Sequence, residues 1–104
     1  MPIPKEWNLS GKSIILTTGS RGWASIIANG LVEAGANLVL VGHNQPVLDL
    51  AKETTEKHAG RVSTITTDLT RPESIHKAFD EAINLMGKID ALVNDSQVEF
   101  SKPF

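Results

Sequence analysis

The chain contains 104 residues with no cysteine and no tyrosine, and its formal net charge is −2. This length predicts one domain, residues 1–104. The lack of cysteine excludes disulfide frameworks, zinc ribbons, iron–sulfur clusters and thiol catalysis. The near-neutral charge argues against a nucleic-acid partner. We also find no membrane-spanning apolar run and no signal-peptide pattern, so we expect a cytoplasmic protein without a membrane partner.

Apolar, β-branched runs alternate along the chain with segments of helical periodicity. The runs predict strands at 13–18, 37–42, 61–67 and 89–94. The periodic segments predict helices at 22–34, between Asn44 and Gly60, and between Thr70 and Gly87. This βαβαβαβ order predicts an α/β fold: a doubly wound parallel sheet of four strands, covered by helices on both faces.

Capping residues mark the expected ends of these helices. Asn44 precedes a helix with proline in its first turn, and Thr70-Arg-Pro-Glu73 has the spacing of a capping box. Gly35 and Gly87 are expected to end the first and third helices. The periodicity predicts these inward-facing residues: Trp23, Ile26, Ile27, Gly30, Leu31, Ala34, Val47, Leu50, Ala51, Thr54, Ile75, Phe79, Ala82, Ile83 and Met86.

The turn after the first strand reads Leu16-Thr-Thr-Gly-Ser-Arg-Gly-Trp-Ala24. In doubly wound folds this turn is where a phosphate binds, because backbone N–H groups and the helix dipole attract the anion there. Many βα units also need a glycine at this point for packing alone. The position after the first strand of a parallel sheet favours phosphate binding.

Four segments together resemble the short-chain dehydrogenase/reductases, in the family's order and spacing. They are Asn8-Leu-Ser-Gly-Lys12, Thr17–Ala24, Thr67-Asp-Leu69 and Leu92-Val-Asn94. The resemblance covers essentially the whole chain but corresponds to the front half of a family member. It implies a truncated, Rossmann-like sheet with strand order 3-2-1-4 and a partial dinucleotide-binding domain.

The resemblance also implies a set of cofactor-binding residues. The second strand ends in Gly42-His43-Asn44 without the acid that binds the ribose of NAD, so we expect NADP in preference to NAD. Arg21 and His43 would face the 2′-phosphate and Asp68 the adenine, although solvated Arg21 and His43 and a turn-forming Asp68 are the plainer alternatives. The expected cofactor-binding residues are Thr17, Gly19, Ser20, Arg21, Gly22, His43, Asp68, Leu69 and Asn94.

Four residues depart from the family pattern and are expected to weaken cofactor binding. Thr18 stands where the family has glycine, so we expect a β-branched side chain where a tight turn needs glycine. Trp23 adds bulk beside the cofactor, unless it packs inward as part of the helix core. Asp95 and Gln97 place a carboxylate and a long amide after the fourth strand, where the family has small neutral groups.

In the family, hydride transfer depends on a tyrosine, a lysine and a serine that follow the front half. This chain has no tyrosine, so we assign no catalytic residue and expect it to be inactive alone. Its three histidines lack metal-ligand spacing, so no metal site is expected.

Three hypotheses follow. The first is the NAD(P)-binding portion of a short-chain oxidoreductase. The second is a non-enzymatic assembly module or degenerate remnant, whose exposed fourth strand pairs with another copy or with a complementary catalytic half. The third, a receiver-type signalling domain, needs an acidic cluster at the strand ends that the sequence lacks.

Overall fold

The computed structural model describes residues 7–18, 23–55 and 62–95, except the side chains of Trp23, Ala24, Thr54 and Asp95. Strands and helices alternate as the sequence predicts, and the strands form one parallel sheet in the order β3-β2-β1-β4. The predicted Rossmann-like fold class is therefore confirmed. The elements are β1 (Ser13–Thr18), α1 (Trp23–Glu33), β2 (Asn37–Gly42), α2 (Gln45–Thr55), β3 (Val62–Thr66), α3 (Pro72–Met86) and β4 (Ala91–Asp95).

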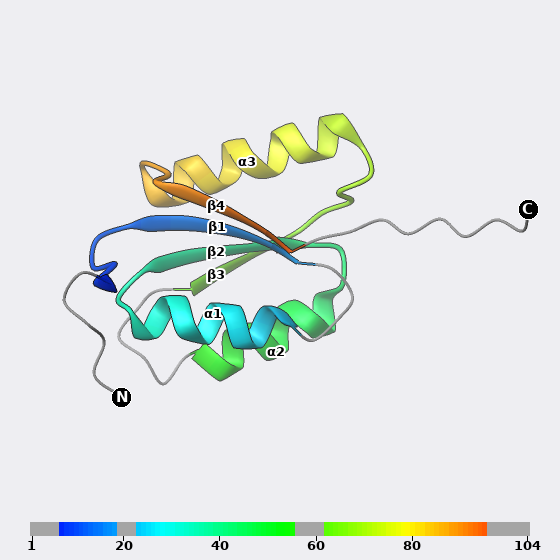
Figure 1. Ribbon diagram of the computed structural model, residues 1–104. Coiled ribbons are helices and arrows are strands. Elements are labelled where there is room, and N and C mark those ends of the chain that lie inside the picture. Colours follow the sequence, from blue (N-terminus) through cyan, green and yellow to red (C-terminus); the bar gives the residue numbers. More distant parts are fainter. Residues whose placement is uncertain (1–6, 19–22, 56–61, 96–104) are drawn as a thin grey trace, which may run out of the picture.

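The sheet lies between two layers of helices. Helices α1 and α2 cover one face, and α3 covers the other (Figure 1). The two central strands are buried along nearly their whole length because helices cover both of their faces, as in other parallel sheets. Because the strands are all parallel, their four carboxyl ends lie at one edge of the sheet.

Each face of the sheet has its own apolar core. On the α1 and α2 side, Leu16 and Leu40 of the strands are buried with Val32 and Leu48 of the helices. On the α3 side the buried side chains are Ile15, Val39, Val41, Ile65, Ala78 and Ala82. Small alanines on α3 allow that helix to lie close to the strands.

Four helical residues that we predicted to face inward are exposed, Gly30 of α1 among them. Ile26 on α1 is 67% exposed, Leu50 on α2 is 54% exposed and Ile83 on α3 is 46% exposed. On α1 the buried side chains are instead Ala28 and Val32, so the buried face is rotated from the predicted one. The prediction was wrong there because each helix contacts the sheet along one stripe, and apolar side chains beside that stripe remain exposed.

The helix ends follow the expected capping chemistry at α2 and at two glycines. The Val47 amide donates to Asn44 Oδ1 at 3.2 Å, which confirms Asn44 as the cap of α2. Gly35 and Gly87 have φ values of 103° and 79°, a left-handed conformation that favours glycine. The Gly87 amide closes α3 by donating to the Ile83 carbonyl at 2.7 Å. Gly60, the expected end of α2, lies outside the described residues.

Strand β4 lies at one edge of the sheet. It begins at Ala91 and not at Ile89 as predicted, and Asp90, which precedes it, is hydrogen-bonded to Ser13 of β1. The Ser13 amide donates to Asp90 Oδ2 at 2.8 Å, and the Asp90 amide donates to the Ser13 carbonyl at 2.7 Å. In the described part of the chain β4 pairs with β1 alone, and its Leu92 is 55% exposed.

Candidate functional site

Polar side chains from all four strands gather at the carboxyl edge of the sheet. Thr17 and Thr18 end β1, His43 follows β2, Asp68 follows β3, and Asn94 lies near the end of β4. In open α/β sheets ligands bind in the crevice outside this edge, at the point where the strand order reverses. Here the reversal falls between β1 and β4.

Thr17 and Asn94 are joined across that reversal point. They are directly opposite in the β1–β4 register, and Thr17 Oγ1 donates to Asn94 Oδ1 at 2.6 Å. Thr17 is buried, so its hydroxyl needs this partner. The bond ties together two predicted cofactor-binding residues that are 77 positions apart in the sequence.

Thr18 lies opposite Gly42 at the ends of β1 and β2. It is an ordinary strand residue with negative φ, so the turn strain we expected from a β-branched side chain here is absent. The side chain fits because Gly42 has none: a Cβ atom at Gly42 would lie 2.3 Å from Thr18 Oγ1. The Thr18 side chain thus occupies the space that the missing side chain of Gly42 leaves free.

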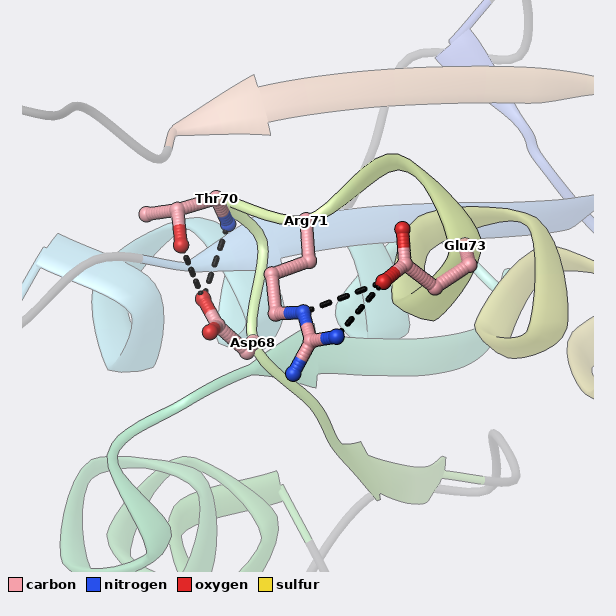
Figure 2. A network of polar contacts seen from close by, with 4 residues as sticks. All are labelled: Asp68, Thr70, Arg71 and Glu73. Atoms are coloured by element: carbon pink, nitrogen blue, oxygen red, sulfur yellow. Dashed lines mark hydrogen bonds and ion pairs between the residues drawn. The ribbon is translucent and has the colours of Figure 1, made fainter.

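The loop after β3 is organised by Asp68. Its Oδ1 accepts hydrogen bonds from the Thr70 amide at 2.9 Å and the Thr70 hydroxyl at 2.5 Å (Figure 2). These two bonds hold the pKa of the Asp68 carboxyl below its ordinary value, with smaller contributions from the positive charges of Arg71 and His43. Asp68 therefore forms the turn that was our plainer alternative, and it does so beside the carboxyl edge of the sheet.

The start of α3 corrects our predicted capping box. The Thr70 hydroxyl donates to Asp68, and the residue preceding the helix is Arg71, whose side chain makes no capping bond. The guanidinium of Arg71 instead donates to Glu73 Oε1 at 2.7 and 3.1 Å, as Figure 2 shows. Both capping-box side chains thus have other partners, and the prediction was wrong.

We predict that Thr70→Val raises the pKa of Asp68 toward the ordinary value, because it removes the hydroxyl that contributes most to the lowered pKa. Carboxyl NMR titration of both proteins measures this. The bonds to Asp68 stabilise the fold above the ordinary carboxyl pKa, and this contribution is lost as pH falls through the folded-state value. An unchanged pKa in the variant would contradict the assignment, and Thr70→Ser is the matched control that keeps the hydroxyl.

Of the other expected site residues, the structure describes His43 and Leu69 but not the rest. His43 is exposed at the end of β2, and Leu69 is partly buried against the α3 side of the core. Gly19, Ser20, Arg21, Gly22 and Gln97 lie outside the described residues, as do the side chains of Trp23 and Asp95.

Two features of this edge were missed from the sequence. We considered Gly42 only as the position that lacks the ribose-binding acid, although a glycine that ends an apolar strand indicates a close neighbour there. Gln45 was not singled out, yet its Oε1 accepts a hydrogen bond from the Thr66 hydroxyl and so ties α2 to the end of β3.

A family model described as short chain dehydrogenase matches residues 12–104. The chain belongs to this family. Among curated short-chain dehydrogenase relatives, a 3-oxoacyl-[acyl-carrier-protein] reductase from Aquifex aeolicus is 33% identical over 95% of this chain. A gluconate 5-dehydrogenase from Gluconobacter oxydans is 32% identical over 99% of it. The chain spans 40% of the length of both relatives.

A solved short-chain dehydrogenase/reductase from Serratia marcescens, in a doubly substituted form, has the same fold. It aligns with a TM-score of 0.80 and 25% identity, over 88% of this chain and 38% of that one. The described residues of this chain include no helix long and apolar enough to cross a membrane. They also include no cluster of three or more histidines or carboxylates that could hold a metal ion.

Proposed function

We propose that this chain is the nicotinamide-dinucleotide-binding portion of a short-chain oxidoreductase. The observation that carries the proposal is the Thr17–Asn94 hydrogen bond, which joins the carboxyl ends of β1 and β4 where the strand order reverses. This is the position at which open α/β sheets bind dinucleotides. Membership of the short-chain dehydrogenase family supports the same assignment.

The residues at the crevice fit such a cofactor. We propose that the turn of residues 19–22 binds the pyrophosphate, with Thr17 and Asn94 lining the crevice floor. Asp68 and Leu69 would lie against the adenine. A bound nicotinamide would supply hydride transfer, while proton transfer to the substrate is assigned to no residue of this chain.

We further propose that NADP is the preferred cofactor. Strand β2 ends at Gly42, so it presents no carboxylate to repel a 2′-phosphate or to bind the free ribose hydroxyl of NAD. Exposed His43 follows directly, and the sequence motif includes Arg21 in the segment proposed to bind phosphate. The positive charge of Arg21 would attract the additional phosphate.

Thermal melting with added dinucleotide tests this function. NADP+ at 100 times its Kd should stabilise the native chain by about 2.7 kcal/mol, which raises Tm by ~10 °C or more for a domain of this size. NAD+ at the same concentration should give a smaller rise. His43→Ala should narrow the difference between the two cofactors, whereas His76→Ala on the exposed side of α3 should not.

Inorganic pyrophosphate at equal concentration controls for binding of any anion. The proposed function is rejected if neither dinucleotide raises Tm above the pyrophosphate control. Equal shifts with NADP+ and NAD+ would retain dinucleotide binding and reject only the preference for NADP.

The strand-four edge supports a second candidate, an assembly module. Among the described residues β4 pairs on one side alone, with β1, and Leu92 is 55% exposed there. Open edges of this kind readily pair with another strand. A chain that self-associates in sedimentation experiments and shows no dinucleotide-dependent change in Tm would favour this second function.

A further inference from the structure

The last residue of β2 has no side chain to bind the cofactor ribose, and the Thr18 side chain of the neighbouring strand β1 occupies that space. Dinucleotide-binding sheets commonly end this strand in an acid that accepts a hydrogen bond from the ribose. Here the last residue is Gly42, and a Cβ atom built on it would meet Thr18 Oγ1 at 2.3 Å. The Thr18 hydroxyl on β1 therefore stands where a side chain of residue 42 would begin.

This hydroxyl is buried without a hydrogen-bond partner. Thr18 has no exposed surface, and Oγ1 is the buried side-chain atom that remains unsatisfied in the described part of the chain. Other buried threonines are satisfied: Thr17 donates to Asn94, and Thr55 donates to the carbonyls of Ala51 and Lys52. An unsatisfied polar group of this kind calls for an explanation, and a ligand that completes its bonding is one.

We infer that the Thr18 hydroxyl hydrogen-bonds the 2′ position of the adenosine ribose of a bound dinucleotide. The inference rests on the proposed function. Thr18 is covered in the structure, where Leu48 Cδ2 lies 3.6 Å from the Cβ position of Gly42, so binding requires a side-chain rotation at Thr18 or Leu48. Such rotamer changes are common when partners bind.

A hydroxyl in this place has a different selectivity from an acid. A carboxylate accepts from the ribose hydroxyl but repels a 2′-phosphate, whereas a neutral hydroxyl donates to a phosphate oxygen or bonds the free hydroxyl. Thr18 is thus a specificity-determining residue that makes the ribose subsite compatible with NADP. It reaches that subsite only because Gly42 leaves room for it.

Thr18→Val tests the inference, because it keeps the shape of the side chain and removes the hydroxyl. The ligand-free variant should melt at a higher temperature than the original chain, since no unsatisfied oxygen remains buried. Its affinity for NADP+, measured by calorimetric titration, should fall about tenfold. Thr18→Ser keeps the hydroxyl and should bind within about twofold of the original chain.

A ligand analogue makes the test specific to the ribose. The original chain should bind NAD+ more tightly than NAD+ lacking the adenosine 2′-hydroxyl, whereas Thr18→Val should bind the two equally. If the original chain binds dinucleotide and Thr18→Val binds it equally well, the inference is overturned while the proposed function stands. If the original chain binds no dinucleotide, the proposed function fails and the inference fails with it.

Discussion

Replacing Leu40 with alanine should lower the free energy of unfolding by about 2–5 kcal/mol. Leu40 lies in the middle of a central strand, has no exposed surface, and belongs to the core beneath α1 and α2. Truncation removes buried apolar atoms and leaves a cavity that close-packed neighbours fill only in part. Because domains of this size are stable by about 5–15 kcal/mol, urea denaturation should show a large drop in midpoint.

Leu50→Ala is the matched control, because it makes the same chemical change on α2 at a side chain that is 54% exposed. It should cost less than about 1 kcal/mol, since little apolar surface is lost from the interior. Equal losses at the two leucines would contradict the burial that the structure assigns to them. They would instead support the inward-facing position that helical spacing predicts for Leu50.

Replacing Gly42 with alanine should destabilise the chain by about 1–3 kcal/mol through overpacking. The new Cβ would lie 2.3 Å from Thr18 Oγ1 and 3.0 Å from the Thr18 carbonyl oxygen. Thr18 is β-branched and fully buried, so the rotamer change that would relieve this clash costs free energy. Gly30→Ala on α1 is the contrasting control: its Cβ meets no atom within 4 Å, and alanine should stabilise that helix by up to about 1 kcal/mol.

A second substitution at Thr18 shows whether the clash is the cause. Thr18→Ala removes the hydroxyl, so the double variant with Gly42→Ala should recover part of the lost stability. The remaining loss is expected from the Thr18 carbonyl oxygen, which the second substitution does not move. Additive losses in the two single variants and the double variant would show that these positions do not interact.

The central strands could be predicted to the residue because their physical signal is simple. The bounds predicted for β1 and β2 match the structure, since each strand has an apolar or β-branched interior and is buried along nearly its whole length. The edge strand was harder to place. Ile89 is apolar and packs against the core on the α3 side, but it precedes the hydrogen-bonded ladder that begins at Ala91. An apolar residue in the sequence indicates burial, and residues outside the paired part of a strand can be buried too.

The polar parts of the site could be predicted by position but not by partner. The sequence places Thr17, Asp68 and Asn94 near strand ends, and parallel topology brings those ends to one edge. It does not determine which hydroxyl bonds which oxygen. The Thr70 hydroxyl bonds Asp68 instead of capping α3, because a competing acceptor lies two residues away. The fit of Thr18 to Gly42 depends on the β1–β2 register, which pattern reading does not supply.

The bond between Thr17 and Asn94 also has a kinetic consequence. Strands β1, β2 and β3 are close neighbours in sequence, but this contact closes a loop between residues 77 positions apart. Contacts of such long range form slowly, because loop closure is opposed by chain entropy. On a ribosome adding about 5–20 residues per second, β1 remains an open edge for roughly 4–15 s before β4 is synthesised. The β1–β4 pairing is therefore the last of the described strand pairings to form, and the growing chain is most exposed to misassembly at β1 during that interval.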